Sequence, residues 1–395
     1  MRARSRHRSL WLLASLTVAG VVACERVTPS SPAPHAEFII AAADSVFWVR
    51  SDDDGIRVRG APLSLALVGG RFVELFLSDV DQSFYDAVYV GQRLTKRDLV
   101  TGDSLVIFSD TLIPVLARAY AAANPDERPL GDEEEGSENP RTIASAEIAV
   151  LDVLGPWLSY EYRTDVDVIG GQSAHGSRRG VSDLRTGSAT SLEALLGPRE
   201  SARVIAEGRK QWRVALDSLR LLMADRSEYE SSEVDRLSVD PRSFTLSVVE
   251  RQLHIRFAIA QSAARDLSGS YELEGIQVAP PEWWSAVRAQ LPVESDSGER
   301  HWRREEFTLV ARDVTERAAR VSFALRDEAG TEWRLGSVPS PVFRVMWIDD
   351  SLAPGSRAAL VRAFNESALV SEDLRIALAV IAPDRQMKPA LEEHR

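Results

Sequence analysis

The stretch RDLVTGDS, residues 97–104, lies between two runs of strand-forming residues, RLTKR leading in and SLVIF leading out. Within it, Asp98 precedes Gly102 by four positions. An aspartate side chain accepts hydrogen bonds from nearby backbone N–H groups, and glycine readily takes the left-handed conformation. The stretch therefore predicts a β-hairpin closed by a type I turn and a glycine bulge.

The same turn pattern returns 85 positions later as SDLRTGSA, residues 182–189. Sliding the chain by 85 also pairs Gly70 with Gly155, Gly91 with Gly176 and Arg93 with Arg178. Two explanations stay open: a true internal duplication, or independent use of one favoured turn chemistry. Neither explanation makes the loop catalytic.

Other local signals recur along the chain. Asp54-Gly55 and Gly69-Gly70 each separate two strand-like runs, as tight hairpins require. Apolar residues at helical spacing mark residues 191–223, and a short helix is expected after Pro281. The predicted fold class is α+β: antiparallel β hairpins with a few packed helices, in two to three domains after an N-terminal signal and tether.

The N-terminus has the form of an export signal. Four arginines and a histidine precede an apolar run from Leu10 to Ala23, which is shorter than the roughly 20 residues that span a bilayer. The following VVAC, Val21 to Cys24, resembles the lipobox of bacterial lipoproteins, and this resemblance implies that Cys24 carries lipid. The alternative is an ordinary signal peptide followed by a stray or buried cysteine. By the lipoprotein sorting rule of enteric bacteria, Glu25 favours the outer over the inner membrane.

Composition restricts the class of partner. Cys24 is the one cysteine in the chain, so no internal disulfide forms, and the 44% hydrophobic content is ordinary for a globular protein. The net charge is −12, and removal of four signal arginines makes it −16. Such an acidic surface repels phosphate backbones, which argues against nucleic acid as a partner. The expected partners are the membrane, through the lipid anchor, and an envelope protein or peptidoglycan-related ligand.

Composition shifts divide the chain into six predicted segments. They are a signal peptide (1–23), a Pro- and Ser-rich tether (24–36), a β-rich domain (37–125), an acidic linker (126–144), an α+β module (145–292) and a C-terminal β-rich region with a β-α-β outline (293–395).

The central segment, from about Leu158 to Leu291, is similar to an extracytoplasmic module of a lysozyme-sensing anti-sigma factor and of some peptidoglycan deacetylases. The matching features are LSYEY, GGQSAH, VSDLRTG, LEAL, the helix after Pro198, the hairpin FTLSVVERQLHIRF and the segment PEWW. Gln172 and Ser173 interrupt the family's Gly-Gly-Ala-His loop. The resemblance implies an α+β fold and a binding or sensing role for about a third of the chain.

The loop GGQSAHG, residues 170–176, also raises a hydrolase hypothesis through Ser173 and His175. A nucleophile elbow needs glycine at the position of His175. Such an elbow also connects a strand to a helix. Here the loop leads into another strand. We therefore favour a structural role for these residues, in which Gly170 and Gly171 close the loop and His175 is a surface or capping residue. No catalytic residue is therefore predicted.

No metal or cofactor is expected. The mature histidines lack H-x-x-x-H or clustered spacing, and no phosphate-binding glycine loop, dinucleotide fingerprint or C-x-x-C is present. The acidic clusters at residues 52–54 and 79–81 lack the twelfth-position glutamate of an EF-hand, so they are interpreted as solvated turns.

Trp283 and Trp284 are adjacent on the predicted short helix, so one should enter the core. The other, with His301 and Trp302, is a candidate contact patch or sugar-stacking platform. The predicted binding surface thus consists of Gly170, Gly171, Ser173, His175, Trp283 and Trp284.

Three functions are consistent with these observations. The favoured one is a lipid-anchored, non-enzymatic binding or sensing protein of the bacterial envelope. The alternatives are a serine hydrolase acting through the GGQSAH loop and a structural lipoprotein of an envelope assembly.

Overall fold

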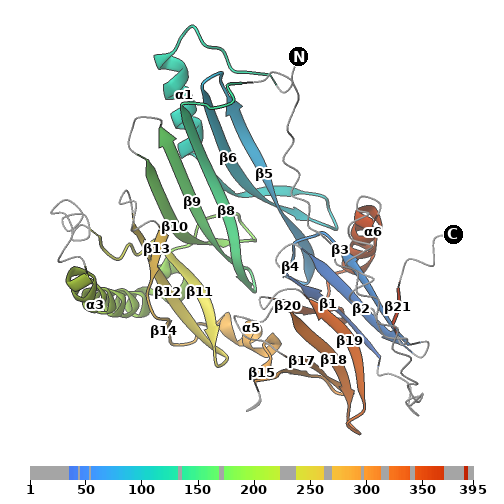
Figure 1. The fold of residues 1–395 in the computed structure, drawn as a ribbon. Coiled ribbons are helices and arrows are strands. Elements are labelled where there is room, and N and C mark those ends of the chain that lie inside the picture. Colours follow the sequence, from blue (N-terminus) through green and yellow to red (C-terminus); the bar gives the residue numbers. More distant parts are fainter. Residues whose placement is uncertain are drawn as a thin grey trace, which may run out of the picture. The chain divides into compact units, whose positions relative to one another are not determined.

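The computed structural model describes residues 35–42, 45–52, 55–131, 136–168, 173–222, 237–261, 269–294, 298–312, 320–338, 343–368 and 387–389. These residues fall in one compact unit, Ala33–Arg395. They form mostly antiparallel sheets with few helices, which confirms the predicted α+β class (Figure 1).

The N-terminal sheet joins both ends of the described chain. Its strand order is β20 (Arg344–Trp347), β1 (Ala36–Ala41), β2 (Val46–Asp52), β3 (Gly55–Ala61) and β21 (Met387–Pro389). Strand β1 is buried on both faces: Phe38 belongs to one hydrophobic cluster, and Ile39 to another that includes Phe364 of α6 (Ser356–Ala368). Successive side chains of a strand point to opposite faces, so β1 serves two cores at once.

The seven-stranded sheet is built from two neighbouring meanders. Its order is β10 (Ala174–Asp183), β9 (Trp157–Val168), β8 (Thr142–Leu154), β6 (Ala87–Asp98), β5 (Arg71–Ser83) and β4 (Leu65–Val68), with β7 (Ser104–Ser109) also paired to β6. Helix α1 (Leu112–Ala123) buries Ile113 and Ala117 in the core of this sheet.

Hydrogen bonding crosses the predicted acidic linker 126–144 and the predicted boundary at 293. Strand β8 pairs with β6, and β20 pairs with β1. In the described part of the acidic segment, the backbone N–H groups of Leu130, Ser137 and Arg141 donate to carbonyls of Ser83, Tyr85 and Asp86. These bonds satisfy carbonyl groups at the β5–β6 connection, so the described residues of the predicted solvated linker attach to the sheet.

The two repeated turns have the predicted geometry. Asp98 Oδ1 accepts from Val100 N at 2.8 Å, and Gly102 has φ +78°. Asp183 Oδ1 accepts from Arg185 N at 2.8 Å, and Gly187 has φ +74°. The first turn closes the β6–β7 hairpin, whereas the second is flanked by a single antiparallel bridge between Ser182 and Ala189.

The 85-residue offset extends beyond the turns. It moves β5 to residues 156–168, where β9 lies, and β6 to residues 172–183, where β10 lies. It also moves α1 into the first half of α3 (Pro198–Leu222). Because β6 and β8 are parallel, the meanders β4-β5-β6 and β8-β9-β10 run in the same directions across the sheet. This shared order favours an internal duplication over turn chemistry alone.

A four-stranded sheet and three helices share the next core. The strands are β11 (Phe244–Val249), β12 (Gln252–Gln261), β13 (Gly269–Glu272) and β14 (Ile276–Gln277). Helices α2 (Leu192–Leu196), α3 and α5 (Trp284–Gln290) supply Leu192, Trp212 and Trp284 to this core. Ser191 caps α2, because its Oγ accepts from Ala194 N at 3.2 Å.

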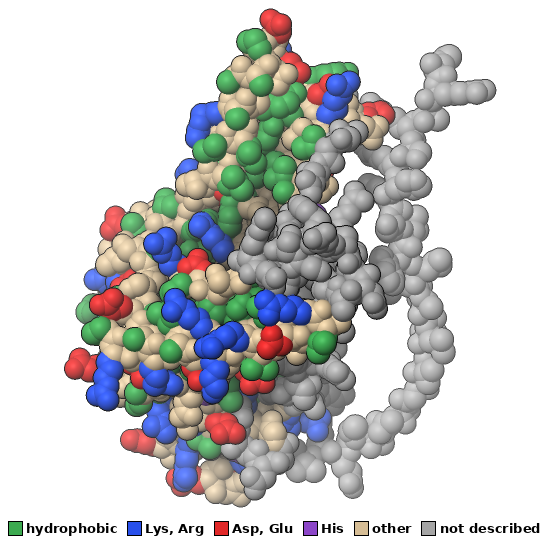
Figure 2. Space-filling model, turned by 90° about the vertical axis from the view of Figure 1, so that its left-hand side faces the viewer, with side chains coloured by type: hydrophobic (Ala, Val, Ile, Leu, Met, Phe, Trp, Pro, Cys, Tyr) green, Lys and Arg blue, Asp and Glu red, His purple; other side chains and the backbone are tan. Residues whose placement is uncertain are grey.

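The C-terminal sheet is a meander of β15 (Val293–Glu294), β16 (Arg300–Arg303), β17 (Phe307–Arg312), β18 (Val321–Asp327) and β19 (Glu332–Val338). Its inward residues, including Trp302 and Leu309, share a hydrophobic cluster with Phe38 and Trp347 of the N-terminal sheet. Figure 2 shows one face of the molecule, where basic and acidic side chains are interspersed. Within the described ranges, no helix has both the length and the apolar character needed to cross a bilayer.

Candidate ligand-binding cavity

A cavity of about 690 Å³ lies where several elements of the compact unit meet. Strands β8 and β10, the β11–β12 hairpin, helix α5 and strands β16 and β20 contribute to its lining. This volume is within the roughly 300–1,000 Å³ range of small-molecule sites. The cavity is therefore the candidate functional site of the described chain.

The cavity is rich in arginine. Five arginines and three carboxylates line it, which leaves a local excess of two positive charges in a chain whose net charge is −12. The basic residues are Arg179, Arg251, Arg256, Arg300 and Arg344, and the acidic ones are Asp152, Glu250 and Glu272. A cationic cavity in an acidic protein indicates a site for an anion.

Glu272 connects two of these arginines. One of its oxygens, Oε1, lies 3.1 Å from Arg179 Nη1 and 3.2 Å from Arg256 Nη1. Burial by itself raises the pKa of Glu272, but the hydrogen bonds from Arg179 and Arg256 outweigh it and hold the pKa below its ordinary value. Glu272 is therefore ionised at neutral pH and neutralises at most one of the two guanidinium charges.

Arg179 also faces Glu161, a buried carboxylate on β9. Arg179 Nε lies 3.9 Å from Glu161 Oε1, an ion-pair distance too long for a hydrogen bond. Glu161 accepts from Ser177 Oγ and from Arg163 Nη2, each at 2.8 Å. Burial raises the pKa of Glu161, but these contacts together lower it below its ordinary value. This network holds Arg179 in place beside the cavity.

Several buried polar atoms of the cavity lack a partner within the described part of the chain. They are the Nε atoms of Arg179, Arg256 and Arg344 and the Oγ of Ser247. Arg344 uses Nη1 to reach Asp152 Oδ1 at 3.4 Å, which leaves its Nε–H without an acceptor. An unsatisfied buried donor costs about 1–3 kcal/mol, so a ligand that supplies an acceptor to these atoms would gain that free energy on binding.

The rim of the cavity carries backbone strain. Glu250 and Arg251 connect β11 to β12 with φ of +49° and +59°, a conformation that non-glycine residues rarely adopt. The Arg251 guanidinium donates to the carbonyls of Leu291 at 2.8 Å and Arg288 at 3.0 Å, at the C-terminal end of α5. These bonds hold the strained turn against α5. Positive φ at both central residues is what a two-residue hairpin loop requires.

The remaining wall of the cavity is apolar. Leu246 and Val287 come from the four-stranded-sheet core, and Trp302 and Met346 from the two other sheets. Phe343 adds an aromatic face, and the Arg300 guanidinium lies 5.9 Å from the centre of its ring. The site thus combines guanidinium donors with an apolar surface.

The predicted GGQSAH site is described in part. Gly170 and Gly171 lie outside the described residues, as does Cys24. His175 Nδ1 lies 2.6 Å from Asp165 Oδ1, across the β9–β10 pair. In the described part of the chain Ser173 makes no hydrogen bond to His175, so the structure pairs His175 with Asp165 and not with Ser173. Ser173 and His175 are also absent from the cavity lining.

The tryptophans pack into cores. Trp284 is buried, and Trp283 is half-buried against Trp157, with ring centres 5.8 Å apart. Trp283 Nε1 donates to Leu195 O at 3.3 Å. Trp302 is buried in a different hydrophobic cluster. Trp283 and Trp302 therefore do not form a single exposed platform.

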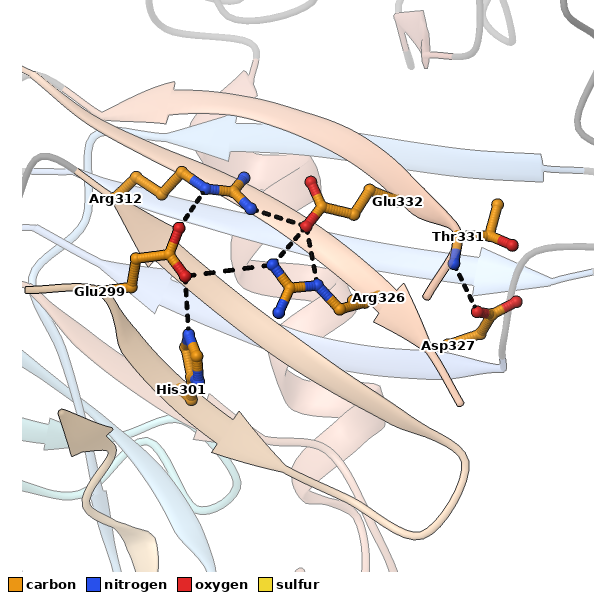
Figure 3. A network of polar contacts seen from close by, with 7 residues as sticks. All are labelled: Glu299, His301, Arg312, Arg326, Asp327, Thr331 and Glu332. Carbon is orange, nitrogen blue, oxygen red and sulfur yellow. Dashed lines mark hydrogen bonds and ion pairs between the residues drawn. The ribbon is translucent and has the colours of Figure 1, made fainter. Parts of the chain in front are cut away.

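His301 belongs to an ionic network on the C-terminal sheet (Figure 3). Its Nε2 lies 3.0 Å from Glu299 Oε2, while Glu299 Oε1 accepts from Arg312 Nε at 2.7 Å. Glu332 accepts from Arg312 and Arg326, both at 2.7 Å. Hydrogen bonds from His301 and Arg312 hold the pKa of Glu299 below its ordinary value. The network pairs its charges internally, so it stabilises the strands and offers no unmatched charge to a ligand.

No group of three or more metal-ligating side chains occurs among the described residues. In the predicted acidic cluster at 79–81, burial and the neighbouring Asp79 raise the pKa of Asp81.

Sequence reasoning missed the cavity arginines. Arg179, Arg256 and Arg344 lie on three different strands and are spread over 166 positions of the chain. The available signal was the alternation of QLHIRF, which places Arg256 on the opposite face from buried Ile255. That alternation does not reveal which other strands face it.

Comparison with known proteins yields distant structural similarity. No protein-family model and no curated protein matches the chain. Among solved structures, it is similar to a DUF3298 family member from Bacteroides fragilis, at 11% identity and TM-score 0.27, over 54% of this chain and 97% of that chain. It is also similar to a DUF3298 family protein from Pseudomonas aeruginosa, at 12% identity and TM-score 0.28, over 52% of this chain and 95% of that chain.

Proposed function

We propose that the protein is a lipid-anchored binding protein of the bacterial envelope that holds its ligand without transforming it. The observation that carries the proposal is the 690 Å³ cavity with its unpaired arginine donors. Such donors favour binding of a complementary group. The export signal and the cysteine after VVA support a location outside the cytosol.

The membrane anchor is tested with radiolabelled palmitate. The full chain should incorporate label, and Cys24→Ala should abolish incorporation because it removes the sulfur that carries the lipid. Glu25→Asp is the matched control, since it changes the neighbouring residue and leaves the sulfur in place. Equal labelling or equal membrane association of the Cys24→Ala chain would overturn the anchor.

Ligand binding is tested by native mass spectrometry of residues 25–395, which contain the whole compact unit. Protein purified from bacterial cells should carry a non-covalently bound small molecule. The mass of this molecule should stay the same after incubation with the protein, because the protein binds it without transforming it. Arg344→Gln should reduce the occupied fraction because it removes a donor from the cavity. Arg334→Gln, an exposed arginine on β19 outside the cavity lining, should leave it unchanged. Absence of any bound molecule, or equal occupancy in both variants, would contradict binding in this cavity.

A further inference from the structure

We propose that the ligand of the cavity is a small anionic amphiphile, an oxyanion attached to an apolar chain or ring. This inference rests on the proposed binding function and adds the chemical class of the ligand. It follows from three properties of the lining: its charge, the donor character of its unpaired arginine Nε atoms, and its apolar wall.

The charge of the lining selects an anion. Glu272 contacts both Arg179 and Arg256 through one oxygen, and Asp152 contacts Arg344 through one oxygen. The other carboxylate near Arg179 is Glu161, at 3.9 Å, and it is shared with Arg163, so three carboxylates serve four arginines. Asp152 Oδ1 also accepts from Val153 N at 2.7 Å, which further reduces its capacity for Arg344. A further carboxylate or a phosphate would complete the pairing of these guanidinium groups. A cation would meet the excess positive charge and would be repelled.

The unmet hydrogen bonds select an acceptor. The Nε atoms of Arg179, Arg256 and Arg344 are donors that have no acceptor capacity. A guanidinium presents its N–H groups in a planar fork that matches carboxylate and phosphate oxygens. An oxyanion therefore fits these atoms better than a neutral hydroxyl, which supplies fewer lone pairs and no charge.

The apolar wall selects an amphiphile rather than a free ion. Trp302, Met346 and Val287 present buried hydrophobic surface to the cavity, and 690 Å³ greatly exceeds the space that an inorganic ion occupies. Burial of apolar ligand surface contributes about 25 cal/mol per Å². A protein anchored at a lipid surface also meets amphiphilic anions at high local concentration.

The test is isothermal titration calorimetry of residues 25–395 with four probes: decanoate, decyl phosphate, decanol and acetate. The better of the two charged ten-carbon probes should bind at least tenfold more tightly than decanol, which lacks the charge, and than acetate, which lacks the chain. Tighter binding of decyl phosphate would indicate a phosphate headgroup as the natural source. Tighter binding of decanoate would indicate a fatty carboxylate.

Arg256→Gln should weaken binding of the preferred anion at least tenfold and leave decanol affinity unchanged, while Arg334→Gln should change neither. If Arg256→Gln does not fold, Arg344→Gln on a different sheet serves the same purpose. If decanol binds as tightly as the charged probes, the anionic ligand class is overturned, but the proposed binding function is not. Failure of every probe, with a bound molecule still seen by mass spectrometry, would also overturn the ligand class alone. Failure of every probe and no bound molecule would overturn the binding function as well.

Discussion

Gly208 lies in the middle of α3, where substitution by alanine brings two effects of opposite sign. At an exposed position of a helix, replacing glycine by alanine stabilises by about 1 kcal/mol because the backbone loses less freedom on folding. At Gly208, however, an added Cβ would lie 2.7 Å from Cδ2 and Cε2 of Phe257, which is fully buried on β12. Ordinary contact begins near 3.4 Å, so the ring or the helix must shift by roughly 0.7 Å.

The clash should outweigh the gain in helix propensity. Overpacking a dense core typically costs about 1–3 kcal/mol, and the ring has no solvent-facing side into which to move. We therefore expect Gly208→Ala to lower the free energy of unfolding by about 0–2 kcal/mol after the helix gain is included. Urea denaturation followed by tryptophan fluorescence measures this change.

A double-mutant cycle with Phe257→Leu isolates the clash. With the smaller leucine at 257, adding Gly208→Ala should be neutral or stabilising, which gives a coupling energy of about 1–3 kcal/mol. Ser218→Ala, at an exposed position of the same helix, controls for helix propensity and should gain about 0.5 kcal/mol or less. If Gly208→Ala stabilises by about 1 kcal/mol in the presence of Phe257, the close approach of helix and ring is refuted.

Three further measurements test other parts of the fold. Gly69→Ala and Gly70→Ala both place a side chain at positive φ, at a cost of about 1–2 kcal/mol each. Gly70→Ala should cost about 1–3 kcal/mol more, because its Cβ would lie 2.7 Å from Ser351 O; equal thermal-melt losses for the two variants would contradict this contact. The lowered pKa values of Glu161 and Glu272 mean that the folded state binds fewer protons, so their stabilisation is present above the ordinary pKa of 4.5 and is lost as pH falls through the folded pKa. Glu161→Gln should therefore differ from the parent most at neutral pH and least near pH 3 in urea titrations, and a constant difference would count against the Glu161 network. Burial and the hydrogen bond to Glu127 raise the pKa of Tyr120 to about 12, so Tyr120→Phe should remove absorbance change at 295 nm near pH 12 and leave the earlier part of the titration unaltered.

The local features of the fold could be predicted because their causes lie within a few residues. Asp98 and Gly102 close their turn through contacts inside the turn itself, and Asp183 and Gly187 repeat it. The hairpin at Gly69-Gly70 follows from the same kind of backbone requirement.

Features that depend on distant partners could not be predicted in the same way. Trp302 was expected on a contact surface, but it is buried, because the C-terminal sheet packs against Phe38 and Trp347 of the N-terminal sheet. The acidic composition of residues 126–144 predicted a solvated linker, without indicating what it contacts. The backbone carbonyls of Ser83, Tyr85 and Asp86 supply acceptors for the described part of that segment, and no local pattern announces this.

By itself the sequence determined the hairpins, the two Asp-Gly turns, the amphipathic helices and the α+β class, because short-range propensity and hydrophobic periodicity suffice for these. Lipid attachment at Cys24, and the membrane location that it implies, remain predictions that rest on the residues around Cys24. Only the tertiary structure decided that β20 pairs with β1 and that Arg179, Arg256 and Arg344 line one cavity. The physical reason is that strand pairing and burial act between residues far apart in the chain, and the spacing of charged residues along a sequence carries no record of which faces meet.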